Sequence, residues 1–333
     1  MPAHPMSGRI AAPSSVAVAD AARRLRAGEL VAFPTETVYG LGADAGNPDA
    51  VHRIFTAKGR PSDHPVIVHL PHVTHVAHWA REFPDGARRL AAAFWPGPLT
   101  LILPRASHVD DAVTGGQDSV GLRMPAHPVA SALLTAFAAL GGDGIAAPSA
   151  NRFGHVSPTT AQHVADDLAD AVAMILDGGS CAVGIESTIV AFTGGEPSLL
   201  RPGGIGIDAL AGVLGRAPNS PGADAPRASG MLASHYAPHA AARLLTAGDL
   251  LSEVARSSAR GERVAVLART LPCPREFIGA WVVASAAAQG YAHELYANLR
   301  ALDLPGVKAI LIEAVPDDPE WLAVRDRLTR ATN

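Results

Sequence analysis

The sequence has 333 residues, of which 48% are hydrophobic, 17% charged and 5% aromatic, and its formal net charge is -4. This composition supplies enough apolar side chains for a buried core, which argues against a disordered chain. The near-neutral charge also argues against a strongly basic nucleic-acid-binding protein, although a local basic cleft is compatible with it. The length suggests two domains.

The absence of recognisable targeting signals and the small number of cysteines predict a cytoplasmic protein. Residues 1–15 lack the basic start and the apolar run of a signal peptide. The sequence contains no run of about 18 apolar residues that could span a membrane. Cys181 and Cys273 lie far apart and form no CxxC pair, so we expect neither a disulfide framework nor a zinc knuckle.

Helical and strand spacings alternate through the first two-thirds of the chain, which predicts an α/β fold. In chain order, the predicted elements are a helix at 16–27, a strand at 30–33, a helix at 49–57, a strand at 66–70, helical stretches through Trp79 and Phe94, strands at 99–103 and 120–124, a helix at 128–140, a strand at 145–147, a helix from Ser157 to about 168, strands at 173–176, 187–192 and 198–201, and a helix at 207–214. Ser157 followed by Pro158 predicts a helix N-cap. Residues 34–42 and 148–157 are predicted loops.

The chain changes character at residues 215–242, which are rich in Pro, Gly, Ala and Ser and predict a long linker. Beyond the linker, the pattern restarts with strands near 243–245, 263–267 and 309–313 and helices at 248–259, 290–301 and 320–330. We therefore expect a flexible tail at 1–14, a first domain at 15–214 and a second, smaller α/β domain at 243–333.

Common nucleotide-binding and hydrolase motifs are absent from the sequence. It contains no GxxxxGK[ST] P-loop and no GxSxG elbow. His69, His72, His75 and His78 lie three residues apart, which is compatible with metal binding. Because no carboxylate or cysteine completes a convincing ligand set, surface histidines are favoured over a metal site.

Lys58 and Arg60 project two cations from one turn, Lys-Gly-Arg-Pro, at the end of a predicted helix. Lys58 is one of only two lysines among 27 lysines and arginines, so its compact ammonium stands out. Two cations this close repel each other by roughly 1 kcal/mol or more in a partly solvated site, and a polyphosphate would relieve that repulsion. The alternative is a solvated helix C-terminus, where cations are favourable in any protein.

Ser149 and Asn151 lie in a loop between a buried strand and a helix. Their hydroxyl and amide groups could hold phosphate oxygens, and backbone N–H groups near Ser157 could add an anion site. For these residues alone, ordinary turn and capping chemistry is the favoured explanation.

Seven motifs in order make the chain resemble a known family. They are PTETVYGLG (34–42), KGRP (58–61), FWPGPLT (94–100), VGLRMP (120–125), APSAN (147–151), STIV (187–190) and RPG (201–203). This set is similar to the YrdC/Sua5 family of threonylcarbamoyl-AMP synthases over about residues 15–205. The linker segment SHYAP (234–238) and the small C-terminal domain resemble the longer Sua5 branch.

The resemblance implies a fold and a reaction. The fold is a twisted mixed sheet with helices around a concave cleft, followed by a small Rossmann-like α/β domain. L-Threonine, bicarbonate or CO2, and ATP with Mg2+ give threonylcarbamoyl-AMP and pyrophosphate. Downstream proteins then transfer the threonylcarbamoyl group to adenosine 37 of tRNA. Weak contact of this chain with tRNA is compatible with the resemblance, and no membrane is involved.

The resemblance also implies site residues, which we give by role. The implied catalytic residues are Lys58, Arg60, Ser149 and Asn151. The implied threonine-binding residues are Thr35, His69, Arg123, Ala147 and Ser187. The implied ATP-binding residues are Lys58, Ser62, Ser119, Ser149, Ser157, Arg201 and Tyr236. The resemblance implies no metal held by protein ligands alone.

The chemistry of these side chains suits the implied reaction. The reacting carbamate and triphosphate are both anionic, so positive charge and orientation are the main needs. The guanidinium of Arg123 can grip a carboxylate through two parallel hydrogen bonds, and Tyr236 in the linker could close over the nucleotide. Each side chain also has an ordinary structural explanation, such as a strand-end charge for Arg123 or a packing anchor for Tyr236.

Two departures and two alternatives stay open at this stage. Residues 231–234 (Met-Leu-Ala-Ser) lack the lysines common before this linker segment, and Ser62 lies in a variable part of its loop. The first alternative is a tRNA- or dsRNA-binding module without adenylation activity, against which the charge and the few aromatic residues argue. The second is a carbamoyl-transfer maturation enzyme, which would carry cysteine sets that this chain lacks.

Overall fold

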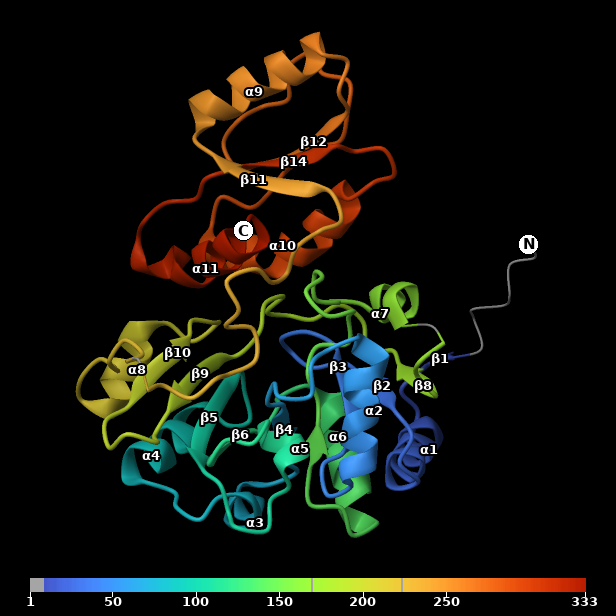
Figure 1. The fold of residues 1–333 in the computed structure, drawn as a ribbon, viewed down its shortest axis with the longest axis vertical. Coiled ribbons are helices and arrows are strands. Elements are labelled where there is room, and N and C mark those ends of the chain that lie inside the picture. Colours follow the sequence, from blue (N-terminus) through green and yellow to red (C-terminus); the bar gives the residue numbers. More distant parts are fainter. Residues whose placement is uncertain (1–8, 169, 223) are drawn as a thin grey trace. The chain divides into compact units, whose positions relative to one another are not determined.

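The computed structural model describes residues 9–168, 170–222 and 224–333, and they form two compact units. The first unit holds the described residues within Met1–Phe153, Pro158–Ala182 and Glu186–Met231. The second unit holds Leu232–Asn333 together with two short pieces of the earlier chain, Gly154–Ser157 and Val183–Ile185. Figure 1 shows the elements of each unit with the labels used below. No helix in the described residues is both long enough and apolar enough to cross a membrane.

The first unit is built on a ten-stranded sheet of order β1-β8-β2-β3-β7-β4-β6-β5-β9-β10. The strands are β1 (Ile10–Ala11), β2 (Val31–Phe33), β3 (Gly40–Asp44), β4 (Ile67–His69), β5 (Leu99–Pro104), β6 (Ser119–Arg123), β7 (Ile145–Ala146), β8 (Met174–Leu176), β9 (Thr188–Ala191) and β10 (Ser198–Arg201). The sheet contains both parallel and antiparallel pairs; for example, β4 runs parallel to β6 and antiparallel to β7. The predicted α/β class is therefore confirmed, as a mixed sheet.

Helices cover both faces of this sheet (Figure 1). They are α1 (Ser15–Arg26), α2 (Pro48–Lys58), α3 (Val76–Trp79) after a 3-10 turn at Val73–His75, α4 (Asp85–Phe94), α5 (Asp111–Thr114), α6 (Pro128–Ala139), α7 (Ala161–Leu168) and α8 (Ile207–Leu214). Alternate residues of a strand point to opposite faces, so Val31 and Phe33 belong to one core cluster and Ala32 to the other.

Local signals place Lys58 at the last position of α2. Asn47 caps the start of this helix through its side chain, which accepts a hydrogen bond from the amide of Ala50, and Pro48 occupies the first turn. Gly59 ends the helix in the left-handed conformation, at a φ of 64°. The sequence therefore fixes the point at which the Lys-Gly-Arg-Pro turn leaves the helix.

Two predictions about local structure are wrong. Ser157 does not cap a helix that begins at Pro158, because α7 begins at Ala161. The carbonyls of Pro158 and Thr159 instead accept hydrogen bonds from the amides of Tyr39 and Cys181, so they are not available to a helical turn.

The second error concerns the predicted loop at 34–42, whose end forms strand β3 from Gly40 onward. Gly42 permits this strand to pair closely with β2, because a Cβ atom there would lie 2.9 Å from the Phe33 ring and 3.0 Å from the carbonyl oxygen of Val31. The two-residue strand β1 was likewise not predicted.

The second unit has a four-stranded parallel sheet of order β11-β14-β12-β13. Its elements are β11 (Ala241–Leu245), α9 (Ala247–Ala259), β12 (Val264–Ala268), β13 (Trp281–Val283), α10 (Ala288–Leu302), β14 (Ala309–Glu313), a 3-10 turn at Pro319–Trp321 and α11 (Leu322–Ala331). Parallel strands joined through helices are typical of a Rossmann-like fold. Strand β13 is the one element of this unit that the sequence did not predict.

Candidate functional site

Three sequence motifs meet through backbone hydrogen bonds in the first unit. The amide of Leu41 donates to the carbonyl of Pro148 at 2.8 Å, and the amide of Ala150 donates to the carbonyl of Tyr39 at 2.9 Å. The amide of Phe153 donates to the carbonyl of Lys58 at 2.8 Å. Residues 34–42, 58–61 and 147–151 are therefore parts of one structure, although they are far apart in sequence.

Lys58 lies at the centre of this structure and is buried, with 3% of its surface exposed. Its Nζ donates to the carbonyl oxygens of Ser149 and Asn151, at 2.5 Å each. Burial, and then the nearby cation of Arg60, hold the pKa of Lys58 well below its usual value. An anion bound beside the ammonium would oppose both effects and raise the pKa, since it would compensate the buried positive charge.

A buried ion pair lies at the end of β6. Nη2 of Arg123 lies 2.6 Å from Oε1 of Glu36, and both side chains are almost completely buried. The other carboxylate oxygen of Glu36 accepts a hydrogen bond from the amide of Ala126 at 3.1 Å. Nε of Arg123 is buried and has no hydrogen-bond partner among residues 9–168, 170–222 and 224–333. The guanidinium is thus held on one edge and keeps a donor for a further acceptor.

His69 lies beside Arg123, because the two residues are register partners in the parallel pair β4–β6. Burial, and then the charge of Arg123, lower the pKa of His69 to about 3. The ring is therefore neutral at physiological pH. Its Nδ1 is buried and, within the described part of the chain, has no hydrogen-bond partner.

A hydrogen-bonded row of hydroxyls continues from the Arg123 strand toward β9. Thr100 lies opposite Arg123 in the β5–β6 register. Its hydroxyl lies 2.7 Å from Oγ of Ser187. Arg201 donates from Nε to the carbonyl of Ser187 at 3.0 Å and from Nη2 to its hydroxyl at 3.1 Å. These bonds fix Ser187 between Thr100 and a buried guanidinium.

A glycine allows the RPG motif (201–203) to lie close to the STIV motif (187–190). A Cβ atom on Gly203 would lie 2.4 Å from the backbone nitrogen of Thr188 and 2.7 Å from the carbonyl oxygen of Glu186. The RPG and STIV motifs therefore pack backbone to backbone, which only glycine at position 203 allows.

Arg60 and Arg201 share one partner. Nη2 of Arg60 donates to the carbonyl of Pro65 at 2.8 Å and to Oγ of Ser229 at 3.2 Å. Nη1 of Arg201 donates to the carbonyl oxygen of Ser229 at 2.7 Å. Both arginines are buried, so two guanidinium groups meet at a single serine.

Comparisons with known proteins show the family to which the chain belongs. A family model described as "Telomere recombination" (Sua5_yciO_yrdC) matches residues 23–203, and one described as "Threonylcarbamoyl-AMP synthase, C-terminal domain" (Sua5_C) matches residues 205–333. The chain belongs to the Sua5/YrdC family. It is of the Sua5 type, since both family models match.

Relatives of this Sua5-type chain cover almost all of it. The threonylcarbamoyl-AMP synthase of Pyrococcus abyssi is 40% identical over 94% of this chain and 93% of its own length. The synthase of Bacillus subtilis is 41% identical over 94% of this chain and 92% of its own length. The crystal structure of P. abyssi Sua5 complexed with L-threonine matches with a TM-score of 0.89 and 38% identity, over 97% of each chain.

The first unit, which carries the YrdC-like match, holds most of the predicted site residues. Thr35, Lys58, Arg60, His69, Ser119, Arg123, Asn151, Ser187 and Arg201 are buried there, Ala147 is buried in the same core, Ser149 is half-buried and Ser62 is exposed. The hydroxyl of Thr35 donates to the carbonyl of Val38 at 2.6 Å and lies 2.8 Å from the hydroxyl of Thr37, so it also shapes its own loop. Ser119 begins β6 and pairs with Pro104.

Ser157 and Tyr236 belong to the second unit. The loop before Ser157 pairs with the chain beside Tyr236 through a bridge between His155 and Ala237. Tyr236 is 1% exposed, its ring lies 5.6 Å from that of Tyr296, and the guanidinium of Arg327 lies 5.4 Å from its centre. It also has a φ of 63°, which is uncommon for a residue with a side chain. These contacts describe a packed tyrosine, and its role toward ATP stays a prediction.

Three residues that bond to the candidate site residues were missed by sequence reasoning: Glu36, Thr100 and Ser229. Glu36 is the acidic residue of the PTETVYGLG motif, and an acid within a largely apolar motif signals a buried cation as its partner. Thr100 belongs to the FWPGPLT motif. It is a polar residue within a predicted buried strand, which is a weaker sign that its hydroxyl has a buried partner. Ser229 lies in the predicted linker and gave no signal.

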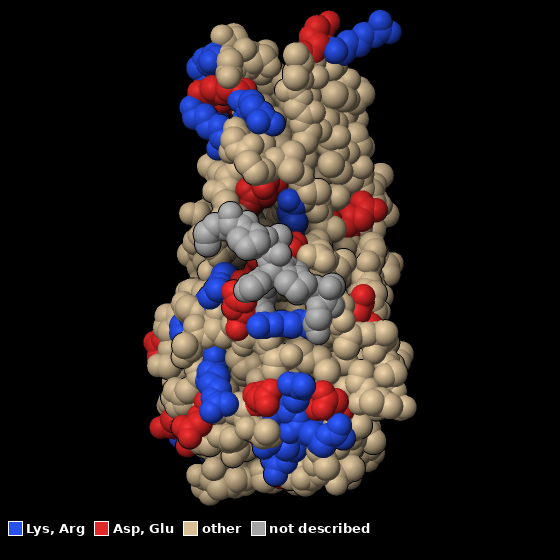
Figure 2. Space-filling model, turned by 90° about the vertical axis from the view of Figure 1, so that its right-hand side faces the viewer, with Lys and Arg blue, Asp and Glu red and all other residues tan. Residues whose placement is uncertain are grey.

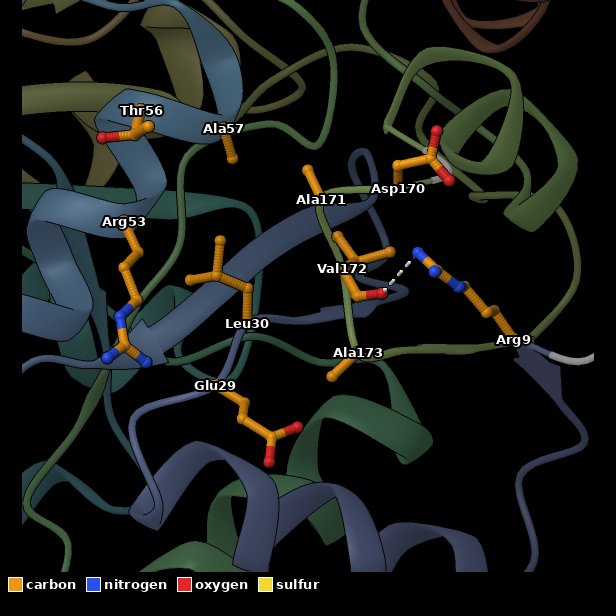
Figure 3. Close-up of a pocket in the computed structure, with 10 residues that line it drawn as sticks. All are labelled: Arg9, Glu29, Leu30, Arg53, Thr56, Ala57, Asp170, Ala171, Val172 and Ala173. Atoms are coloured by element: carbon orange, nitrogen blue, oxygen red, sulfur yellow. Dashed lines mark hydrogen bonds between the residues drawn. The ribbon is translucent and has the colours of Figure 1, made fainter.

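A separate cavity of about 520 Å³ lies in the first unit (Figure 3). Arg9, Glu29, Arg53 and Asp170 surround its lining of small and apolar residues, and Arg9 donates to the carbonyl of Val172 at 3.2 Å. None of the predicted site residues lines this cavity. It therefore does not contribute to the candidate site.

The buried His69 predicts an acid-sensitive stability. Its pKa is about 3 in the folded protein, below the ordinary value of about 6.5, so only the unfolded chain gains a proton between these values. The contribution is complete above about pH 6.5 and is lost as the pH falls toward 3. Between about pH 7.5 and about pH 5, this group should lower the free energy of unfolding by roughly 2 kcal/mol.

Urea denaturation of the wild type and of His69→Asn at both pH values measures this effect. The pH-dependent loss should be smaller by roughly 2 kcal/mol in the variant, while the same change at the exposed His108 should leave it unaltered. An equal pH-dependent loss in His69→Asn and wild type would show that His69 is not buried in its neutral form.

Proposed function

We propose that this chain makes threonylcarbamoyl-AMP and pyrophosphate from L-threonine, bicarbonate or CO2, and ATP. The observation that carries the proposal is the alignment of nearly the whole chain with threonylcarbamoyl-AMP synthases, at 40% and 41% identity. The structure adds a physical reason, because two sets of side chains suited to two anionic reactants lie on neighbouring strands and loops of one sheet.

The threonine end of the site is assigned to Arg123, His69 and Ser187. Arg123 would receive the threonine carboxylate through Nε, since Glu36 already holds Nη2. The neutral His69 adds no second positive charge, so it does not repel a threonine ammonium group. Ser187 and Thr35 supply hydroxyls for the polar groups of the amino acid, and Ala147 supplies an apolar wall.

The ATP end is assigned to Lys58, Arg60 and Arg201, with Ser149 and Asn151 beside them. The ammonium of Lys58 is already fixed by two carbonyl oxygens, so little side-chain motion has to be stopped when phosphate binds. Ser62, Ser119, Ser157 and Tyr236 complete the proposed set, and Tyr236 would act from the linker that joins a catalytic domain at 15–214 to the small domain at 243–333.

The reaction joins these two ends. The neutral amine of threonine adds to the carbon of CO2 and releases one proton to water, which gives a carbamate, and a carbamate oxygen attacks the α-phosphorus of ATP. The bond from that phosphorus to the bridging oxygen of pyrophosphate breaks, and pyrophosphate leaves with the electron pair. Arg60 and Lys58 stabilise the charge that develops on the leaving group, so no covalent intermediate with the enzyme is required.

Mg2+ fits this site as an ion that arrives with ATP. The carbonyl oxygens of Ser149 and Asn151 already accept hydrogen bonds from Nζ of Lys58. An Mg2+ ion would therefore take most of its ligands from the phosphates of ATP and from water. Bound there, Mg2+ would neutralise phosphate charge. The catalytic proposal for the protein side chains does not depend on further metal ligands.

We also propose that the reaction takes place in the cytoplasm and that downstream proteins transfer the threonylcarbamoyl group to adenosine 37 of tRNA. Purely RNA-binding function is the weaker candidate. On the face of the molecule drawn in Figure 2, Lys and Arg side chains lie among Asp and Glu side chains, without an extended basic surface.

Mass spectrometry tests the proposal. The purified full chain is incubated with threonine, bicarbonate and Mg-ATP, and threonylcarbamoyl-AMP should appear with an equal amount of pyrophosphate. Omitting threonine or bicarbonate should abolish both products. ATP consumption that is indifferent to threonine, or no product under all conditions, would contradict the proposal.

A further inference from the structure

A strap of the linker, residues 224–231, lies on the first unit. Gln117 clamps it by its side-chain amide: the backbone N–H of Arg227 donates to Oε1 at 2.7 Å, and Nε2 donates to the carbonyl of Arg227 at 3.1 Å. The guanidinium of Arg227 donates to the carbonyl of Gly115 at 2.8 Å. These bonds anchor the strap at one point.

Apolar contacts extend the anchoring along the strap. Ala225, Ala228 and Met231 pack against a cluster formed by Ile67, Ile102, Ile189, Ala191 and Leu200. The three strap residues are only partly buried, and two of them are alanines. Strap docking therefore buries little apolar surface, so apolar contacts contribute little to its stability.

Ser229, two residues after the clamp, meets both guanidinium groups that are proposed to bind polyphosphate. Its hydroxyl accepts from Arg60 at 3.2 Å, and its carbonyl accepts from Arg201 at 2.7 Å. Neutral oxygens thus satisfy donors that would bond more strongly to a phosphate, because charge-assisted hydrogen bonds are about twice as strong as neutral ones.

We propose that the docked strap and a polyphosphate compete for Arg60 and Arg201, and that Gln117 is a positioning residue that sets this competition. In the docked state, Ser229 stands in for an anion and keeps two buried cations hydrogen-bonded. A triphosphate or pyrophosphate displaces it. This inference rests on the proposed function, since it takes both arginines as part of the ATP site.

Gln117 suits the test because its side-chain hydrogen bonds, within the described residues, go to the backbone of Arg227 and to the carbonyl of Thr114, and not to Arg60 or Arg201. The Gln117→Ala variant loses both clamp bonds, so the strap should dock less firmly. Inorganic tripolyphosphate should then bind the full chain about five times more tightly, as measured by calorimetry. Gln162→Ala is the matched control, since Gln162 is exposed and bonds to Asp166 on its own helix.

Proteolysis supplies a second measurement. Trypsin cleaves after arginine, and Arg227 is the clamped residue of the strap. Tripolyphosphate should speed cleavage after Arg227 in the wild type, whereas Gln117→Ala should be cleaved faster without any anion. The effect of tripolyphosphate on the wild type involves no substitution, so structural damage in the variant cannot explain it. Unchanged cleavage of the wild type after Arg227 when tripolyphosphate is bound would contradict the competition.

The outcomes separate this inference from the proposed function. If tripolyphosphate binds the wild type, if Arg60→Ala and Arg201→Ala weaken that binding, and if Gln117→Ala binds it more tightly, the competition is supported. If Gln117→Ala binds tripolyphosphate no more tightly than the wild type, while both arginine variants still bind it more weakly, the competition is overturned and the proposed phosphate site is not. Binding that is indifferent to both arginines overturns the proposed phosphate site and the competition with it.

Discussion

Lys58→Ala is expected to lower threonine-dependent synthesis of threonylcarbamoyl-AMP by roughly 100-fold or more, which is typical of losing one preorganised charge at a reacting group. Lys58 is buried and holds two carbonyl oxygens of the 147–151 loop, so the substitution removes both a cation and the support of that loop. The initial rate of product formation at saturating threonine and ATP measures the effect.

Lys308 provides the matched control, because it is the only other lysine of the sequence. Its side chain is 66% exposed and pairs with Glu262 in the second unit. Lys308→Ala should keep the wild-type rate to within about twofold, since exposed ion pairs contribute little. Near-normal turnover by Lys58→Ala would disprove the assignment of this cation to the reaction.

Arg123→Ala should raise the KM for threonine by about 100-fold and change the KM for ATP far less. Losing a buried charge-assisted contact to a carboxylate costs roughly 2–4 kcal/mol, and the variant also leaves Glu36 without its buried partner. The two Michaelis constants, measured in the same assay, show which substrate depends on this guanidinium.

A second variant separates binding by Arg123 from its positioning by Glu36. Glu36→Gln keeps an oxygen that can accept from the amide of Ala126 but removes the negative charge beside Arg123. Its KM for threonine should rise by roughly tenfold, less than in Arg123→Ala. The exposed Arg81, which pairs with Asp118, is the control for removing an arginine. Equal increases in the KM values for threonine and ATP would exclude a role for Arg123 as the carboxylate clamp.

Local rules in the sequence predicted the elements that carry most of the site. Asn47, Pro48 and Gly59 define the start and end of α2, and so they fix the position of Lys58. Alternating helix and strand patterns were enough to predict an α/β fold with a second sheet near the C-terminus. The signals for these features lie within a few residues of each other.

The missed features depend on contacts between distant residues. Glu36 and Arg123 are 87 residues apart, and Arg60 and Ser229 are 169 residues apart. Such pairs form only after the fold brings distant segments together, and no periodicity within one segment reports the strand order of the sheet. Ser157 shows the same limit, because tertiary bonds to the carbonyls of Pro158 and Thr159 override a favourable capping sequence.

The central claim is that a carbamate oxygen attacks the α-phosphorus of ATP. The product in which each labelled phosphate of ATP is recovered tests this claim most directly. The full chain is incubated with threonine, bicarbonate and ATP carrying phosphorus-32 at either the α- or the γ-phosphate. Attack on the α-phosphorus predicts that the α label enters the threonine-containing product and that the γ label leaves in pyrophosphate. Recovery of the γ label as inorganic phosphate, with no α label joined to threonine, would contradict the account.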